Sequence, residues 1–376
     1  MTRVLVAPDK FKGSLTATEV AEAVRRGLVA GAGSADRHRI ECLPVADGGD
    51  GTLAAVIAAG FEGAPTEATG PVGGPVLTAW ARRGETAVVE MADVSGLGRL
   101  PDGLLQPMTA TSRGTGELVA AALDADVDRI VLGIGGSACT DGGAGLLQAL
   151  GARLLDADGR DIGPGGEALA GIAAVDLAGL HPRLPDVDLV VACDVDNPLT
   201  GPTGAAASYG PQKGADPEQV RALDQGLARF ADVVATDTSH DLRDVPGAGA
   251  AGGVGFAAVA VLGARLEPGI ELLLDLLDFE RHLRGVDLVI VGEGSLDRQS
   301  LHGKAPVGVA RRAAAAGAKV VAVCGVSELD RADLEEAGIA AAYQLVDREP
   351  DPDICIREAA RLLEELAAER LVRYLR

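Results

Sequence analysis

The strongest constraint on the fold of this chain is that its core must be built almost without aromatic rings. Of its 376 residues, 47% are hydrophobic but only 2% are Phe, Trp or Tyr. Alanine, valine and leucine must therefore fill the interior, which suits helices packed on parallel sheets. A chain of this length also exceeds what one hydrophobic core usually serves, so we expect two domains.

Strands and helices alternate at both ends of the chain. Residues 4–7 predict a strand, residues 15–30 a helix, and residues 40–45 a second strand. The alternation returns near the C-terminus, where the pattern predicts strands over residues 286–291 and 320–324 and helices over residues 305–316, 331–337 and 353–373. This order of elements is typical of a Rossmann-like domain.

The middle of the chain has a different pattern, because residues 77–82 and 86–91 predict an antiparallel hairpin. We therefore predict an α/β protein with a Rossmann-like parallel-sheet domain that is discontinuous in sequence, residues 1–72 and 285–376. An inserted second α/β domain, residues 73–284, interrupts it. The active site is expected in the cleft between the two domains.

The helix predicted over residues 15–30 has a clear start and a clear buried face. Thr16 and Glu19 have the spacing of a capping box. The apolar or small residues that recur at helical spacing form one stripe suited to packing on a sheet: Val20, Ala23, Val24, Gly27 and Leu28.

The net charge and the cysteines limit the binding partners and the cellular compartment that we expect. The formal net charge of −21 argues against nucleic acid or an anionic membrane surface as a partner, because no basic stripe offsets it. The five cysteines are far apart and lack metal-ligand spacing, which is typical of a reducing compartment. No signal-peptide pattern or apolar run of roughly 18 residues is present. We expect a cytoplasmic protein and leave a homo-oligomer open.

Lysine is rare in this chain, and its position is informative. Of only five lysines, Lys10, Lys12, Lys213 and Lys304 stand in glycine-rich or turn-like segments that also contain carboxylates or hydroxyls, and Lys319 alone looks ordinary. A compact ammonium beside flexible backbone donors is suited to holding a phosphate as a point charge. Random loss of lysine through biased coding is the alternative.

Two loops near the N-terminus are candidate ligand sites. In residues 9–14, Lys12 stands beside Gly13 at a helix entrance and could hold a phosphate or a substrate carboxylate, or could equally belong to a surface turn. In residues 47–52, Asp47 and Asp50 alternate with glycines. Two carboxylates on such a turn could hold Mg²⁺, although Asp-Gly is also common turn chemistry.

The glycine-rich segment 133–143 follows a strand predicted over residues 129–132. Its spacing satisfies the looser GxGxxA dinucleotide pattern, but Ser137, Thr140 and Asp141 make it richer in oxygen ligands than NAD binding needs. We favour phosphate binding over a bare tight turn. Upstream, Arg113 lies in a segment that could bind an anion, although Thr115 as a helix N-cap is the more economical interpretation.

Three further segments are also candidates. Asp194 ends a strand predicted over residues 189–193, and with the turn around Lys213 it is compatible with a metal and phosphate site or with Asx-Pro turn chemistry. The GxGxxG match at residues 247–252 follows residues too polar for a strand, so we discount dinucleotide binding there but leave open a loop that closes on a ligand.

The densest candidate follows the strand predicted over residues 286–291. Glu293, Asp297 and Lys304 lie on one loop that leads into a helix, and we assign this loop to function. It is not a Walker A loop, because the spacing is wrong and Lys304 precedes Ala305 rather than Ser or Thr. We interpret His302 as a hydrogen-bonding residue at the helix entry rather than a catalyst.

These segments occur together, and in the same order, in bacterial glycerate kinases of the type I family, which the chain resembles over nearly its whole length. The motifs are APDKFKGSL, LPVADGGDGT, GIGGSACTDGGAG, ACDVDNPLTGP, GPQKGA, PGAGAAGG and GEGSLDRQSLHGKAP. The family's Rossmann-like domain, split in sequence by an inserted α/β domain, agrees with the architecture predicted above. The resemblance implies transfer of the ATP γ-phosphoryl group to a hydroxyl of D-glycerate with Mg²⁺, and 2-phosphoglycerate as the expected product.

The resemblance also suggests roles, because phosphoryl transfer depends mainly on positioning and on charge neutralisation. The catalytic candidates are Asp194, Asp297, Lys304 and Lys213. The substrate-binding candidates are Lys12, Asp9, Arg113 and Glu293. The nucleotide- or phosphate-binding candidates are Gly135, Gly136, Ser137, Thr140, Gly249 and Gly252, and the metal candidates are Asp47, Asp50 and Asp141.

Two other functions remain open from the sequence. An NAD-dependent oxidoreductase of a small hydroxy acid would use the glycine segments 133–138 and 247–252. A non-catalytic sugar-acid binding protein would explain binding loops without turnover, but no partner-binding or DNA-binding module is visible.

Overall fold

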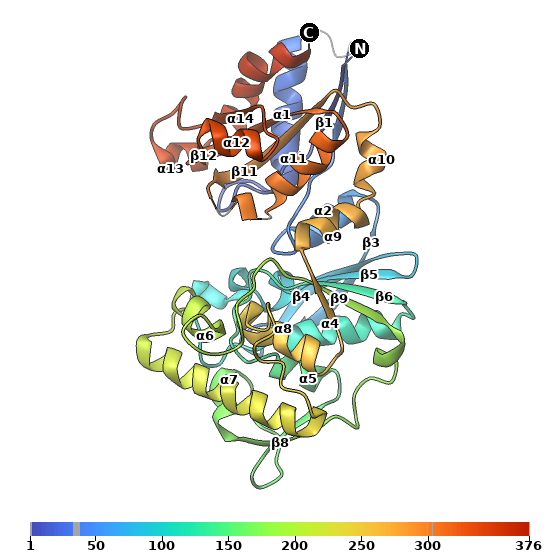
Figure 1. Cartoon of the computed structure of the whole chain (residues 1–376), viewed down its shortest axis with the longest axis vertical. Coiled ribbons are helices and arrows are strands. Elements are labelled where there is room, and N and C mark those ends of the chain that lie inside the picture. Colours follow the sequence, from blue (N-terminus) through green and yellow to red (C-terminus); the bar gives the residue numbers. More distant parts are fainter. Residues whose placement is uncertain (1, 33–37, 299, 303, 376) are drawn as a thin grey trace. The chain divides into compact units, whose positions relative to one another are not determined.

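The computed structural model describes residues 2–32, 38–298, 300–302 and 304–375. The chain divides into two compact units (Figure 1). The terminal unit comprises Met1–Asp47, Ala54–Ala59 and Ile270–Arg376, and the inserted unit comprises Gly48–Leu53 and Gly60–Gly269. Each unit is an α/β structure with its own sheet, so the predicted fold class is confirmed.

The terminal unit is built on a five-stranded parallel sheet. Its order is β13 (Ala341–Gln344), β12 (Lys319–Ser327), β11 (Leu288–Leu296), β1 (Thr2–Val6) and β2 (His38–Cys42). From β1 the chain moves to one side, to β2, whereas from β11 it moves to the other side, to β12 and β13. The strand order therefore reverses between β1 and β11, and such a switch point is where open α/β sheets bind ligands.

Helix α1 (Ala17–Ala32) packs against α14 (Ala359–Leu366) in this unit (Figure 1). The predicted capping box is present, because the Thr16 amide donates to Glu19 Oε2 at 2.8 Å and the Glu19 amide donates to Thr16 Oγ1 at 3.3 Å. The predicted stripe is buried, and its glycine matters most, because a Cβ at Gly27 would lie 2.1 Å from the Glu364 carbonyl oxygen. The two helices can approach this closely only with glycine at position 27.

The other helices of the terminal unit are shorter. Helix α11 (Ala305–Ala315) packs on β11 and β12, and Gly308 in it leaves space for Ile270 of α9 (Gly269–Leu276). The remaining helices are α2 (Thr52–Ala58), α10 (Phe279–Leu283), α12 (Arg331–Glu336) and α13 (Pro352–Arg357). The single helix predicted over residues 353–373 is interrupted at Glu358, which separates α13 from α14. After α14 the chain continues as a π-helical turn, Ala367–Leu371, and a 3-10 turn, Val372–Leu375.

The inserted unit contains a six-stranded mixed sheet. Its order is β10 (Arg265–Glu267), β9 (Asp188–Ala192), β6 (Arg129–Gly133), β5 (Thr86–Glu90), β4 (Pro75–Arg83) and β3 (Glu62–Thr69). The first four strands are parallel, and β4 is antiparallel to both β5 and β3. The hairpin predicted over residues 77–91 is therefore present as β4 and β5. A second, two-stranded sheet pairs β7 (Arg153–Asp156) with β8 (Ile172–Asp176).

Aliphatic side chains dominate the core of the inserted unit, as the composition predicts, and Phe230 and Phe256 form an edge-to-face pair with ring centroids 5.7 Å apart. The helices are α3 (Ala92–Ser95), α4 (Arg113–Asp124), α5 (Ala144–Ala149), α6 (Ala205–Tyr209), α7 (Pro217–Thr238) and α8 (Ala250–Ala260).

The limits of the two units differ from the ranges expected from sequence. Residues 60–72 belong to the inserted unit, and residues 270–284 belong to the terminal unit. Strand β3 accounts for part of the difference, because its sequence Glu-Gly-Ala-Pro-Thr-Glu-Ala-Thr is polar and contains proline, which fits an edge strand but gives a weak strand signal.

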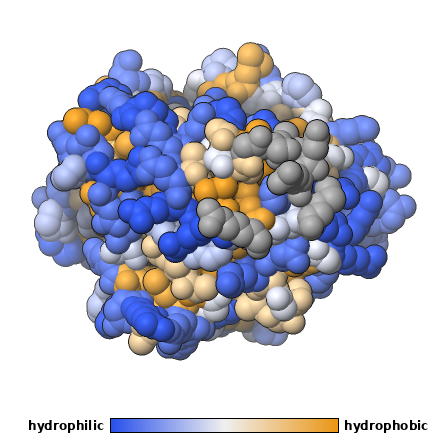
Figure 2. Space-filling view, turned by 90° about the horizontal axis from the view of Figure 1, so that it is seen from above, coloured by the Kyte–Doolittle hydropathy of each residue, from blue (hydrophilic) through white to orange (hydrophobic). Residues whose placement is uncertain are grey.

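The surface and the cysteines agree with the sequence. Hydrophilic side chains cover most of the face shown in Figure 2, in line with the large net charge. All five cysteines are free thiols. Across the described ranges, no helix is both long enough and apolar enough to span a bilayer.

Candidate functional site

Charged side chains gather at the switch point of the terminal unit. The Asp9 amide, just after β1, donates to the Gly292 carbonyl of β11 at 2.8 Å. The segment that ends at Asp47 lies alongside, because the Val45 amide donates to the Pro8 carbonyl at 3.0 Å. Electrostatic coupling links the carboxylates of Asp9 and Glu293 to that of Asp47.

Two carboxyl groups of this cluster hold their protons unusually tightly. Asp9 is only 5% exposed, and burial raises its pKa from 3.8 to about 7. The Lys10 ammonium, 3.7 Å from Asp9 Oδ1, opposes this rise, whereas the Asp47 carboxylate adds to it. Burial also raises the pKa of Glu293, against the opposing effect of Lys304. Crowded, partly desolvated carboxylates of this kind are typical of sites that bind a cation or transfer a proton.

Lys304 points into the same cluster from the N-cap position of α11. Its Nζ lies 3.1 Å from Glu293 Oε1 and 3.9 Å from Asp297 Oδ1. The buried Ser300 fixes both partners, since its hydroxyl donates to Glu293 Oε2 at 2.9 Å and its amide donates to Asp297 Oδ1 at 3.0 Å. The structure therefore brings together the three charged residues predicted on this loop.

The loop after β1 separates its two lysines. Phe11 is buried, and its amide donates to the Leu15 carbonyl at 2.8 Å, so the loop folds back on itself. Gly13 adopts a φ of +78°, which favours glycine at this turn. Lys10 faces Asp9, whereas Lys12 is exposed. The predicted substrate-binding roles of Lys12, Asp9 and Glu293 remain predictions.

Backbone contacts explain the glycines in the inserted unit's segment 133–143. A Cβ at Gly133 would lie 2.5 Å from the Gly48 carbonyl oxygen, which also accepts from the Gly135 amide at 3.2 Å. On another side, a Cβ at Gly252 would lie 2.2 Å from the Cys139 carbonyl oxygen. Close packing of the loops that contain Gly48, residues 133–143 and Gly252 is therefore enough to require glycine at positions 133 and 252. Phosphate binding by Gly135, Gly136 and Gly252 remains a prediction.

The GxGxxG match lacks the context of a dinucleotide fingerprint. Residues 241–249 form turns and irregular structure rather than a strand, in agreement with the sequence prediction. Gly249 is required by packing, because its Cβ would lie 2.2 Å from the Pro198 carbonyl oxygen. Its predicted contact with nucleotide is untested.

Lys213 is among the largest buried side chains described, with 2% exposure. Its ammonium donates to Ser137 Oγ at 2.9 Å and to the Cys139 carbonyl oxygen. Burial lowers its pKa, while the nearby Asp141 carboxylate favours the charged form. Sequence reasoning identified Lys213 and Ser137 separately, and the structure shows that they are partners.

Asp141 is buried within hydrogen bonds that shape the same loop. Its Oδ2 accepts from the Ser112 amide at 2.8 Å and hydroxyl at 2.9 Å, and its Oδ1 accepts from the Gly143 amide at 3.1 Å. Next to it, the buried Thr140 hydroxyl finds no hydrogen-bond partner within the described part of the chain. That hydroxyl could bond a ligand or a water molecule.

Asp194 and Arg113 lie at the carboxyl edge of the inserted unit's parallel strands. Asp194 follows β9, is exposed, and accepts from the Gly269 amide at 2.7 Å. Arg113 begins α4, and its Nε donates to Glu117 Oε1 at 3.0 Å. The prediction that Thr115 caps this helix is wrong, because Thr115 lies inside α4 and its buried hydroxyl donates to Ser95 Oγ at 2.9 Å.

Glu90 is the residue that sequence reasoning missed. It ends β5, is 3% exposed, and accepts from the Gly51 and Leu53 amides at 3.1 and 2.7 Å. Burial raises its pKa to about 7, and Asp50 contributes to the rise. Its sequence signal was weak, because one glutamate at the end of an apolar strand resembles any polar strand end.

The predicted metal ligands do not form a complete protein cage. Asp47 belongs to the terminal unit, whereas Asp50 and Asp141 belong to the inserted unit. Within the described ranges, no group of three or more His, Cys, Asp or Glu side chains has the arrangement of a metal site. The side chain of His302, which was predicted to hydrogen bond at the helix entry, lies outside the described part.

Comparisons with known proteins give one consistent similarity over the whole length. A model of the family described as Glycerate kinase family matches residues 4–376. A Bacillus subtilis protein named Glycerate kinase is 45% identical over 371 residues, covering 98% of this chain and 96% of that protein. An Escherichia coli protein named Glycerate 2-kinase is 45% identical over 348 residues, covering 92% and 90%. The crystal structure of a Salmonella typhimurium LT2 protein named as a glycerate kinase 2 superposes with a TM-score of 0.83 at 41% identity, covering 99% and 97%.

Proposed function

We propose that this chain, which belongs to the glycerate kinase family, transfers the γ-phosphoryl group of ATP to a hydroxyl group of D-glycerate. The observation behind this proposal is that the similarity to proteins named glycerate kinase covers both units. One phosphotransferase activity therefore accounts for the whole chain. The name of the Escherichia coli relative supports the 2-hydroxyl as acceptor and 2-phosphoglycerate as product.

The charged cluster of the terminal unit supports this chemistry. Phosphoryl transfer requires neutralisation of charge on the phosphate oxygens and alignment of the acceptor hydroxyl, with little covalent help from the protein. The Lys304 ammonium supplies a positive charge at the start of α11, and Glu293 and Asp297 hold it in place. We assign Lys304 to the transferring phosphoryl group. Asp297 and Asp194 remain the candidates for orienting or deprotonating the hydroxyl.

Mg²⁺ is the cation proposed to accompany ATP. It usually binds one or two protein carboxylates together with water and substrate phosphates, so a complete protein cage is not needed. Asp47 fits this requirement, because its carboxylate lies close enough to Asp9 and Glu293 to add to the rise in pKa that burial causes in both. When bound, the ion would offset charge on the phosphates. Asp141 fits less well, because both its oxygens already accept hydrogen bonds, and Asp50 remains a second candidate.

Glycerate itself needs a partner for its carboxylate. Lys12 and Arg113 are the proposed cations, and both are exposed at the carboxyl edge of a sheet. The prediction that loops of both units serve one active site remains a prediction, as do a cytoplasmic location and a homo-oligomer.

The test is a coupled assay of ADP formation by the purified chain with ATP, Mg²⁺ and D-glycerate. Parallel reactions without glycerate and with L-glycerate are the controls. The proposal predicts ADP formation that depends on D-glycerate. Phosphorus NMR of the product then identifies the acceptor, because phosphate on carbon 2 couples to one proton and phosphate on carbon 3 couples to two. ADP formation that is independent of glycerate would reject the activity, and coupling to two protons would reject the 2-hydroxyl.

A further inference from the structure

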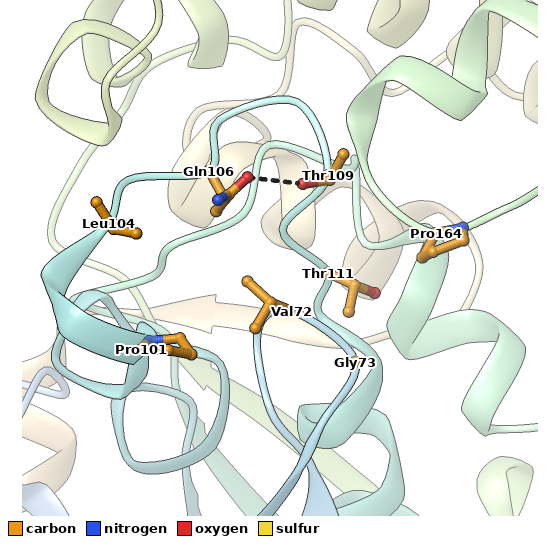
Figure 3. Close-up of a pocket in the computed structure, with 8 residues that line it drawn as sticks. All are labelled: Val72, Gly73, Pro101, Leu104, Gln106, Thr109, Thr111 and Pro164. Carbon is orange, nitrogen blue, oxygen red and sulfur yellow. Dashed lines mark hydrogen bonds between the residues drawn. The ribbon is translucent and has the colours of Figure 1, made fainter.

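A separate pocket of about 360 Å³ lies within the inserted unit (Figure 3). It is surrounded by the turn between β3 and β4, by the segment that leads into α4, and by the loop after β7. The volume falls within the range of about 300–1,000 Å³ typical of small-molecule sites. Neither the sequence motifs nor the charged cluster of the terminal unit accounts for this pocket.

The lining is neutral. Aliphatic groups come from Val72, Pro101, Leu104 and Pro164. Hydrogen-bonding groups come from Gln106, Thr109 and Thr111. A triphosphate or a small carboxylate would call for a cation, and the lining supplies none. A flat, uncharged ring with polar atoms on its edge matches both kinds of group.

Gln106 provides the specific polar contact. Its side-chain amide both donates and accepts hydrogen bonds. In the structure its Oε1 accepts from the Thr109 hydroxyl at 3.3 Å, which holds the amide over the pocket (Figure 3). An amide of this type can pair with the amino group and a ring nitrogen of adenine at the same time.

The pocket wall is connected to the residues predicted to bind phosphate. Thr111 is 2% exposed, and its hydroxyl lies 3.4 Å from Asp141 Oδ2, at the end of the glycine-rich segment 133–143. The Arg113 amide donates to the same hydroxyl at 3.2 Å. Through Thr111, the pocket wall therefore contacts both the glycine-rich segment and the start of α4, where Arg113 stands.

We propose that this pocket binds the nucleobase of ATP, with Gln106 reading the edge of the base and the aliphatic side chains enclosing its faces. This inference rests on the proposed kinase function, because it assigns part of the nucleotide substrate to a place in the fold.

Filling the pocket tests the inference. Val72 is 41% exposed at the turn between β3 and β4, so Val72→Trp can place an indole in the pocket without disturbing the core. The matched control is Leu77→Trp, which adds the same ring at a position 78% exposed on β4 of the same hairpin and outside the pocket lining. We expect Val72→Trp to raise the KM for ATP and the Kd for ADP about tenfold or more. The KM for glycerate should change less than twofold, and Leu77→Trp should match the wild type.

Gln106→Ala provides a second variant that does not depend on how the indole packs. It should weaken ADP binding, measured by titration calorimetry, and leave inhibition by inorganic tripolyphosphate unchanged. Wild-type affinity for ADP in both variants would overturn the inference, as would a rise in the KM for glycerate in place of that for ATP. Calorimetry needs no turnover, so a chain that binds ADP through this pocket but does not phosphorylate glycerate would reject the proposed function and not the pocket.

Discussion

Replacing Lys213 by methionine distinguishes a structural role of this lysine from a catalytic one. If Lys213 positions the segment 133–143, its loss should weaken folding, whereas if it neutralises charge on the transferring phosphoryl group, its loss should lower turnover in a stable protein. The structure favours the first role, because the ammonium is buried and is held by Ser137 and Cys139. Methionine keeps much of the side-chain volume and removes the charge.

The expected destabilisation follows from the contacts that are lost. A hydrogen bond to a charged group contributes roughly 1.5–3 kcal/mol, and a buried carbonyl left without a donor costs about 1–3 kcal/mol. The Cys139 carbonyl loses the ammonium, and Asp141 loses the buried positive charge of Lys213, with which it interacts. Relief from burying an ammonium offsets part of this loss. We expect a net destabilisation of about 3 kcal/mol, which is roughly a 150-fold change in the folding equilibrium.

The measurement is urea unfolding followed by circular dichroism and by tryptophan fluorescence. Trp80, the single tryptophan, lies in the inserted unit and reports on the unit that contains Lys213. Lys319→Met is the control, since Lys319 is exposed in the terminal unit, where its Nζ lies 5.6 Å from the centre of the Tyr374 ring. It should cost at most about 1 kcal/mol. A Lys213→Met variant that unfolds at the wild-type urea concentration but has lost turnover would refute the positioning role.

Three further predictions follow from other contacts. Lys304→Ala should lower kcat by about 10²–10³-fold. The unfolding midpoint should stay nearly unchanged, because the Lys304 side chain is partly exposed. An unaltered kcat would remove Lys304 from the mechanism. Gly252→Ala should destabilise the protein by about 3–5 kcal/mol, because its Cβ would meet the Cys139 carbonyl. The control Gly263→Ala is also at positive φ but in open space, so it should cost only about 1 kcal/mol. Equal losses of unfolding free energy in the two variants would contradict the packing argument. Because the folded state keeps the Asp9 proton up to about pH 7 and the unfolded state loses it near pH 4, wild-type stability should fall as pH rises through this window, by on the order of 4 kcal/mol at most. Asp9→Asn should reduce that fall in urea titrations at pH 5 and pH 8 with EDTA, and the remainder should come from Glu90 and Glu293, whose pKa values are also raised. An identical pH dependence in both proteins would rule out a contribution from Asp9.

The parts of the fold that sequence could predict are those with strong local periodicity. The stripe on α1 and the apolar runs of β1, β6, β9, β11 and β12 identified their elements, because buried parallel strands are apolar on both faces. Edge strand β3 was missed for the opposite reason, since its outward residues are polar and Pro65 weakens the pattern. The interruption at Glu358 was missed because helical periodicity continues on both sides of it.

The site shows where sequence reasoning ends. The segment containing Glu293, Asp297 and Lys304 was identified correctly as a group, because its members are close in the chain. The contact of Lys213 with Ser137 joins residues 76 positions apart, and only the tertiary fold brings them together. Glu90 was missed because its importance depends on burial against the start of α2, which one glutamate in a strand does not reveal.

Folding alone can explain the candidate residues of the inserted unit better than it can explain those of the terminal unit. In the inserted unit, the glycines and Lys213 satisfy packing and hydrogen-bonding needs of the loops themselves, so their presence would be expected even without a ligand. In the terminal unit, the carboxylates of Asp9 and Glu293 are crowded and their pKa values are raised, which makes the folded state less stable near neutral pH. A chain selected only for stability would lose such a cluster, because neutral residues of similar size would cost less. A cation beside these carboxylates would offset this cost, so the proposed binding of Mg²⁺ and nucleotide at this cluster predicts an increase in the stability of the chain.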